Sequence, residues 1–218
     1  MQSRTPASRA GRPRSAAADT AILAATREAL VELGWSKLTL GDVATRAGVA
    51  KTTLYRRWAG KNELVVDAVA ELFDELRLPD CGTLAADIEG VVLQYAAILA
   101  RPEAKSGLMS VVAESIRDEA LRERIRASIV ERQKRLVLEG RARAQQRGEL
   151  PPASDPEEAA RTVDLIFDVV AGAVVHRTLV SAEPADEEWV RSFARILLFG
   201  LTGAGEDHDA APTPEEGP

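Results

Sequence analysis

The chain has 218 residues, of which 45% are hydrophobic and only 4% aromatic, and its formal net charge at pH 7 is −6. No apolar run reaches the roughly 20 residues of a membrane helix, and the arginine-rich start lacks the apolar stretch of a secretory signal. The apolar residues are mostly Ala, Leu and Val without alternating β-branched runs, a composition typical of an all-α protein with one or two domains.

The charge is divided unevenly along the chain. Up to Asn62, eleven Lys and Arg residues stand against four acids, a net charge of +7, so the remainder carries −13. A positive N-terminal module on an acidic body concentrates the attraction for phosphates at one end. The single cysteine, Cys81, excludes an internal disulfide and is compatible with a reducing cytoplasm, where we expect the protein. No basic residue neighbours Cys81 in its turn, which favours an unreactive thiol over a redox sensor.

Residues 1–15 form a basic arm of Arg, Ala, Ser, Gly and Pro that we expect to be disordered when free. Arg12 and Arg14 could lie in a DNA minor groove, as basic arms do in some DNA-binding proteins. A solubilising tail with nonspecific attraction for phosphates would explain the same composition.

A helix is expected from about residue 16 to 33, since apolar residues form one stripe and Gly34 then ends it. The next stretch, at about 38–57, predicts two short helices joined by a turn. Thr39 and Asp42 form a capping-box pattern at the first helix, and Gly48 can adopt the positive φ of a turn. The second helix has Leu54 on its inner face.

Hydrogen-bond donors cover the other faces of that second helix. This arrangement predicts a helix-turn-helix whose second helix enters a DNA major groove. A pair of packed helices with a solvated basic face is the alternative. The donors are Lys51, Thr52, Thr53, Tyr55, Arg56 and Arg57.

The pattern AxxAGVxxTTLYRRWxxKxEL, from Ala44 to Leu64, resembles the DNA-binding segment of the TetR (tetracycline repressor-like) family. With the preceding helix, the resemblance covers roughly residues 16–76. It implies an all-α fold with an N-terminal three-helix helix-turn-helix module and a C-terminal helical domain for ligand binding and dimerisation. It also implies DNA contacts. Thr39, Tyr55 and Lys61 are expected on phosphates, Lys51, Thr52, Thr53 and Arg57 near base edges, and Arg56 on either.

The motif departs from the family pattern at two positions. Ala50 replaces the hydroxyl residue that would cap the second helix, and Gly41 leaves bare a position from which some relatives reach a base. With these two changes, recognition of the DNA sequence is expected to depend on the hydrogen-bond donors of the second helix.

A long helix is expected from Lys61 to about Leu76, followed by a break at 78–83. Lys61 stands where the helix dipole disfavours a cation, which suggests a phosphate partner. Further helical patterns follow at about 84–100, 103–116, 119–147, 156–181 and 186–203. We therefore predict a disordered arm (1–15), a DNA-binding domain (16–76), a regulatory and dimerisation domain (84–204) and a disordered acidic tail (205–218).

Two helices of the body are candidates for a four-helix dimer interface of the kind that TetR-like proteins use. The helix at about 155–181 is apolar on most sides, and the last helix has an apolar seam. An intrachain core is the alternative. The predicted interface residues are Phe167, Val170, Gly172, Val174, Val190, Phe193, Leu197 and Leu201.

The helices of the body also offer walls for a small-molecule cavity, with many apolar residues and few polar ones. An ordinary core has the same composition. The candidate lining residues are Leu93, Tyr95, Met109, Val112, Glu114, Ile125, Phe167 and His176.

No catalytic or metal-binding motif is present, and two histidines with one cysteine do not build a usual metal site. We therefore expect neither an enzyme nor a cofactor. The segment GAVVHRTLV resembles a C-terminal domain type of one TetR subgroup and fixes no ligand. The prediction is a homodimeric repressor released from a palindromic DNA operator by a small-molecule effector. A ligand-independent regulator or an activator is the alternative.

Overall fold

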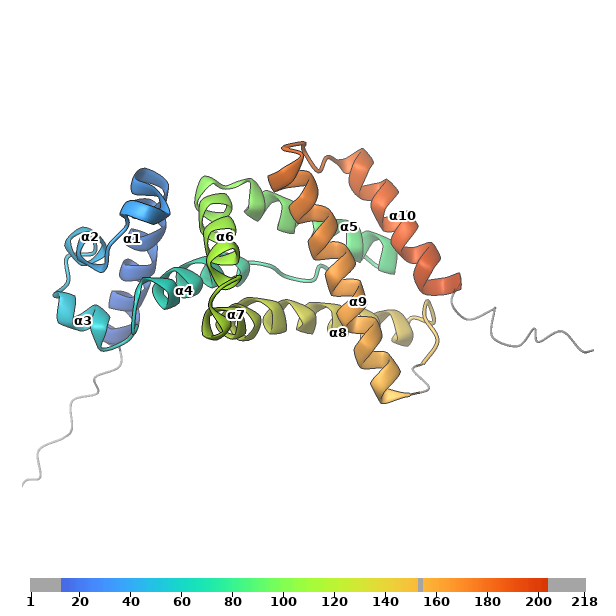
Figure 1. The fold of residues 1–218 in the computed structure, drawn as a ribbon. Helices are drawn as coiled ribbons and strands as arrows, with labels where there is room; N and C mark the ends of the chain where they lie inside the picture. Colours follow the sequence, from blue (N-terminus) through green and yellow to red (C-terminus); the bar gives the residue numbers. More distant parts are fainter. Residues whose placement is uncertain (1–12, 153–154, 204–218) are drawn as a thin grey trace, which may run out of the picture. The chain divides into compact units, whose positions relative to one another are not determined.

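The computed structural model describes residues 13–152 and 155–203, which form helices and no strands (Figure 1). The all-α prediction is confirmed for this part of the chain. The predicted minor-groove residue Arg12 and the acidic tail lie outside the described residues, and the side chain of Arg14 is not described. The helices are α1 (Pro13–Lys37), α2 (Leu40–Arg46), α3 (Lys51–Tyr55), α4 (Lys61–Phe73), α5 (Leu84–Ala100), α6 (Pro102–Ser115), α7 (Glu119–Ile125), η1 (Arg126–Val130), α8 (Glu131–Gln146), α9 (Pro156–Val175), η2 (His176–Val180) and α10 (Glu187–Gly203).

The chain folds into two compact units. The first contains residues up to Glu75 together with 100–132, and the second contains 76–99 and the chain from Gln133 onward. The predicted C-terminal domain (84–204) includes α6 and α7, and by packing these two helices lie in the first compact unit. The reason is packing, because α6 lies against both α1 and α4.

The close approach of α6 to α1 and α4 depends on Gly107. A Cβ atom there would stand 2.4 Å from Cγ2 of Val69 on α4 and 3.3 Å from Cδ2 of Leu30 on α1. No side chain fits at such distances without displacing its neighbours. Leu30 and Val69 are themselves almost fully buried, so Gly107 lets a third helix complete their core.

Two glycines shape the N-terminal module as predicted. Gly34 has φ 72° and interrupts the helical backbone of α1, while Gly48 has φ 66° and turns the chain between α2 and α3. These conformations are costly for any residue with a Cβ atom. The capping box of α2 is also present, since Asp42 N–H donates to Thr39 Oγ1 (3.2 Å) and Thr39 N–H donates to Asp42 Oδ2 (3.0 Å).

Helix α4 is buried on most of its surface, and its acidic residues make ion pairs. Asp67 accepts hydrogen bonds from the indole Nε1 of Trp58 (2.8 Å) and from Arg124 of α7 (2.9 and 3.0 Å). Glu71 pairs with Arg27 of α1 at 2.5 Å. These bonds tie the segment after α3 and the helices α1 and α7 to α4.

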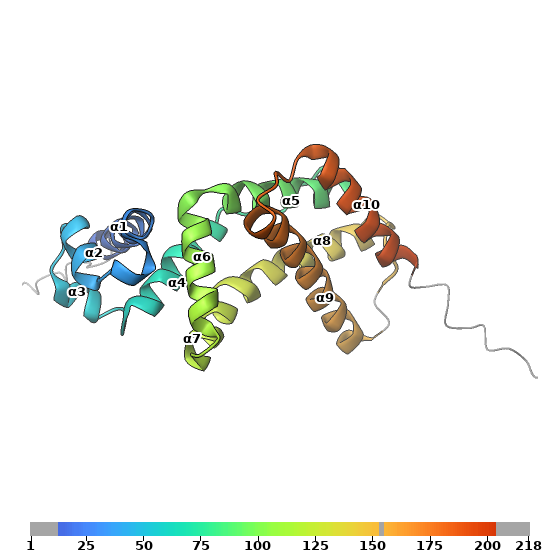
Figure 2. The same cartoon turned by 45° about the horizontal axis from the view of Figure 1, so that its top comes forward.

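The second unit contains most of α5 and α8, together with α9 and α10 (Figure 2). Asp87 of α5 is fully buried and joins the 79–81 loop to α8. Its carboxylate accepts hydrogen bonds from the Cys81 N–H (2.7 Å) and from Arg147 Nη2 (2.8 Å), and Arg143 Nη1 lies 3.6 Å away. The side chain therefore has a cation on α8 as compensation for its burial.

Every helix within the described residues is too short or too polar to cross a bilayer. In the same part of the chain, His, Cys, Asp and Glu side chains do not gather in groups of three or more that could hold a metal ion.

The Asp87 cluster predicts a pH-dependent contribution to stability. Burial raises the pKa of the Asp87 carboxyl, but the Arg147 and Cys81 hydrogen bonds and the arginine charges outweigh it and lower the pKa below 3.8. A carboxyl with a lowered folded pKa stabilises the fold above its unfolded pKa and loses that effect as the pH falls through the folded value. Asp87→Asn should therefore cost about 3 kcal/mol at pH 7, and the difference from the wild type should shrink below pH 3.8.

Denaturant unfolding followed by circular dichroism across this pH range measures the effect. Asp164→Asn is the matched control, because Asp164 pairs with Lys134 of α8 but is 59% exposed. That exposed pair should contribute no more than about 1 kcal/mol. Equal losses in the two variants would contradict a stabilising role for the buried cluster.

Candidate nucleic-acid interface and apolar cavity

Helix α3 is anchored by its apolar side and presents donors on the other. Leu54 is fully buried and Trp58 nearly so. Four of the predicted DNA-contacting side chains in and directly after α3 are exposed, and Thr53 is half-buried. The exposed ones are Lys51, Thr52, Tyr55 and Arg56. Hydroxyls, an ammonium and a guanidinium are the donors that recognise phosphates and base edges.

Two residues expected on DNA have partners within the protein. Arg57 forms an ion pair with Asp19 of α1 and is only 19% exposed. Lys61 donates from Nζ to the carbonyl oxygen of Trp35 (2.8 Å) and lies 4.7 Å from the centre of that indole ring. Each of these cations therefore joins the end of the helix-turn-helix to α1. The expected DNA contacts of Arg57 and Lys61 remain predictions, and in this structure both cations have partners on α1.

The two departures noted in the motif have local explanations. A Cβ atom on Gly41 would lie 3.0 Å from Nζ of Lys51, so the bare position is covered by the Lys51 side chain. Ala50 makes no side-chain cap at α3, as expected. Thr39 is exposed, but its hydroxyl donates to Asp42 Oδ2 (2.6 Å), and that bond is the main cause of the lowered pKa of Asp42.

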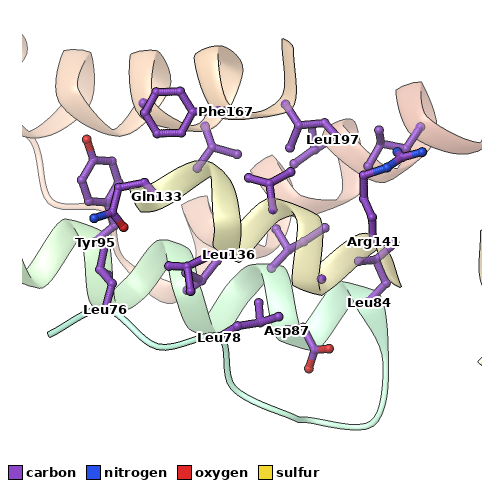
Figure 3. A pocket seen from close by; sticks show the side chains of 18 of the residues that line it. Leu76, Leu78, Leu84, Asp87, Tyr95, Gln133, Leu136, Arg141, Phe167 and Leu197 are labelled. Atoms are coloured by element: carbon purple, nitrogen blue, oxygen red, sulfur yellow. The ribbon is translucent and has the colours of Figure 1, made fainter. Parts of the chain in front are cut away.

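The second unit contains a partly open apolar cavity of about 100 Å³ (Figure 3). Its walls come from α5, α8, α9 and α10 and from the segment that follows α4. Tyr95 stands at one end, and burial raises the pKa of its phenol, which keeps the hydroxyl neutral. The lining residues are Leu76, Leu78, Leu84, Asp87, Ile88, Val91, Tyr95, Gln133, Leu136, Val137, Gly140, Arg141, Leu150, Ile166, Phe167, Val170, Ala171, Leu197 and Leu201.

Comparison with known proteins covers both units. Residues 22–68 match the family described as "Bacterial regulatory proteins, tetR family", and residues 78–197 match "Tetracyclin repressor-like, C-terminal domain". The chain belongs to the TetR family. It is accordingly a DNA-binding transcriptional regulator of the helix-turn-helix class.

Individual relatives extend over nearly the whole chain. The HTH-type transcriptional regulator YdeS of Bacillus subtilis is 28% identical over 196 residues, which cover 89% of this chain and 94% of YdeS. The regulator Rv2250c of Mycobacterium tuberculosis is 30% identical over 173 residues, covering 76% and 87% of the two chains. The crystal structure of the TetR family regulator SCO0332 superposes with a TM-score of 0.68 at 29% identity, covering 84% of this chain and 98% of that one.

For this TetR-family regulator, the cavity differs from the one expected. Tyr95 and Phe167 line it, whereas the other six candidates do not. Met109, Val112, Glu114 and Ile125 belong to α6 and α7 of the first unit, and the first three of them are exposed. The remaining two, Leu93 and His176, are exposed in the second unit.

The sequence reasoning missed the wall that α8 contributes. None of the eight candidate lining residues came from α8, yet Leu136, Val137 and Gly140 of that helix line the cavity. Gly140 follows Leu136 by four residues and Val137 by three, so the three positions share one face of a helix. That spacing could have predicted this wall from the sequence.

The predicted dimer residues divide into two groups. Val174 and Val190 are buried in the second unit, and Phe167, Val170, Leu197 and Leu201 line its cavity. Gly172 is exposed and Phe193 half-buried. Other apolar residues of α9 and α10 are exposed instead: Leu165 (63%), Val169 (41%), Ile196 (72%) and Phe199 (79%).

The environments of Arg56 and Arg57 predict different consequences of their removal. Arg56→Ala should leave the melting temperature unchanged, weaken binding to all DNA and reduce the salt slope by about one. Arg57→Ala should lower the melting temperature, Asp19→Ala should do the same, and the double variant should lose no more than either. Thermal unfolding and salt-dependent fluorescence anisotropy measure the two effects. An unchanged melting temperature in Arg57→Ala, with relaxed specificity, would restore its assignment to a base edge.

Proposed function

We propose that this regulator is a homodimeric repressor that a small-molecule effector releases from a palindromic operator. The observation that carries the proposal is the presence, in one chain, of exposed donors on α3 and an apolar cavity in the second unit. A DNA-binding protein has no structural need of a cavity, whereas an effector site is an apolar pocket with few polar groups.

An exposed apolar face on α9 and α10 supports the dimer. The face consists of Leu165, Val169, Ile196 and Phe199, and Gly172 and Gly200 beside them allow close helix approach. Large exposed apolar patches of this kind mark association surfaces. A two-fold dimer would present two α3 helices to two half-sites of a palindrome.

The route from effector to DNA is the chain segment that follows α4. Leu76 and Leu78 line the cavity, and Leu76 is only three residues beyond the end of α4. A ligand that displaces these side chains would pull on α4, to which Trp58 is bound through Asp67. A tilt of α4 would then change the separation of the two α3 helices and weaken operator binding.

The dimer face predicts the effect of a charge at its centre. Ile196→Glu should convert the dimer to a monomer, because a carboxylate would have to be buried between the two copies. Analytical ultracentrifugation measures the oligomeric state. Ile116→Glu is the matched control, since Ile116 of the first unit is equally exposed (75%, against 72% for Ile196). A dimer in both variants, or a monomer in the wild type, would contradict the proposed interface.

Effector control is tested by a thermal-shift screen of a small-molecule library on the full-length chain. The DNA site would first be selected from a random pool and is expected to be palindromic. A ligand that stabilises the protein should weaken operator binding at least tenfold in the wild type. In Val170→Phe, whose larger side chain would fill part of the cavity, the same ligand should lose its effect while operator binding persists. Ligands that bind without changing operator affinity would favour the ligand-independent regulator instead.

A further inference from the structure

The cavity adjoins a larger groove of about 660 Å³ in the same unit. The groove lies along α9 and α10, and Pro151, Pro152 and Asp155 also line it. Four residues line both the cavity and the groove, and they mark the place where the two meet: Arg141, Ile166, Leu197 and Leu201.

Arg141 is the charged member of this shared set. It is half-buried, and within residues 13–152 and 155–203 it makes neither a hydrogen bond nor an ion pair. Two nearby arginines differ, since Arg143 of α8 pairs with Glu139 (2.9 Å) and Arg147, directly after α8, pairs with Asp87 (2.8 Å). A half-buried guanidinium without a partner retains its full capacity to bind an anion.

The position of Arg141 fits the head group of a ligand bound in the cavity. Figure 3 shows its side chain at the end of the cavity remote from Tyr95, with the guanidinium directed toward α10. The carboxylate of Asp87, by contrast, points away from the cavity. The connection lies next to the same part of α8, because Gln145, one turn after Arg141, donates to the carbonyl oxygen of Pro151 (3.0 Å).

Two acids, Asp155 and Glu158, also line the groove but not the cavity. The carboxylate of Asp155 caps α9 by accepting from the N–H groups of Glu157 (3.0 Å) and Glu158 (3.3 Å). Glu158 is exposed to solvent. Arg141 is therefore the charged residue that lines both the cavity and the groove, whereas Asp87 lines the cavity alone and is paired with Arg147.

The size of the cavity limits the apolar part of such a ligand. At about 100 Å³, it is comparable with the roughly 150 Å³ apolar cavity that accepts benzene. A single ring of about the size of benzene, or a short alkyl chain of similar volume, is the appropriate size by that comparison. A longer chain would require the cavity to expand.

We propose that the effector is an amphipathic organic acid, with an apolar group of this size in the cavity and an anionic head paired with Arg141 in the groove. This inference rests on the proposed effector control and names its ligand class. The groove also contains Leu165, Val169 and Ile196 of the exposed apolar face, so the head group would lie near the second copy of the chain.

Calorimetric titration of the full chain, without DNA, tests the ligand class with three probes of equal chain length: octanoate, octanol and octylammonium. The wild type should bind octanoate about tenfold to a hundredfold more tightly than octanol, the range expected for a charge-assisted hydrogen bond. Octylammonium should bind most weakly. 4-Phenylbutanoate and 4-phenylbutanol repeat the comparison for a ring.

Variants on α8 assign the preference to one residue. Arg141→Gln should lower octanoate affinity at least tenfold and leave octanol affinity unchanged, and Arg141→Glu should favour octylammonium over octanoate. Arg135→Gln is the matched control. Arg135 is exposed on the same helix, lines neither space and likewise has no ion pair among the described residues. The Arg135→Gln variant should bind all probes with the affinity of the wild type.

Several results would overturn the inference: equal affinity for octanoate and octanol, a preference for octylammonium in the wild type, an unchanged octanoate affinity in Arg141→Gln, or no binding of either acid. Operator binding in the presence of each probe is measured separately. Arg141-dependent binding of an acid that leaves the operator complex intact would refute effector control by that site and uphold the ligand class. If only an uncharged or cationic ligand released the operator, effector control would be upheld and the ligand class refuted.

Discussion

The first unit depends on the burial of α4. Eight of its thirteen residues are buried, so helices have to cover it on several sides, and α1 and α6 do so. The remaining surface carries acids, and one of them, Asp67, accepts hydrogen bonds from the indole of Trp58 and the guanidinium of Arg124. This carboxylate therefore connects Trp58, which follows α3, and Arg124 of α7 to α4. Gly107 makes this arrangement possible, since any side chain there would separate α6 from α4.

The same constraint divides the cations of the helix-turn-helix into two groups. Arg57 and Lys61 bind to Asp19 and to the Trp35 carbonyl, so their charge fixes the orientation of the module on α1. Lys51 and Arg56 are exposed and remain available to DNA. A net positive charge at this end of the chain therefore overstates the number of cations that can meet phosphates, because some of it stabilises the fold.

In the second unit, polar and apolar contacts are separated. Asp87, Arg143 and Arg147 form their cluster beside the 79–81 loop, and the carboxylate of Asp87 points away from the cavity (Figure 3). Leucine, isoleucine and valine fill the side of α5 and α8 that faces α9 and α10. Among the described residues that line the cavity, Arg141 is the one cation, and it also lines the groove.

Local residue order was sufficient to predict the helices of this TetR-family regulator, because capping boxes, glycines with positive φ and helical stripes act over a few residues. Thr39 with Asp42, Gly34 and Gly48 adopt the expected conformations, and every expected helix is present, with the long stretch at 119–147 divided into α7, η1 and α8. The partners of the same residues could not be predicted that way. Arg57 forms an ion pair with Asp19, 38 positions earlier in the chain. Helices α6 and α7 pack in the first unit. On α9, Val174 is buried and Leu165 is exposed to solvent. These outcomes depend on which helices pack together, and spacing along one helix shows that a face is apolar without showing what covers it.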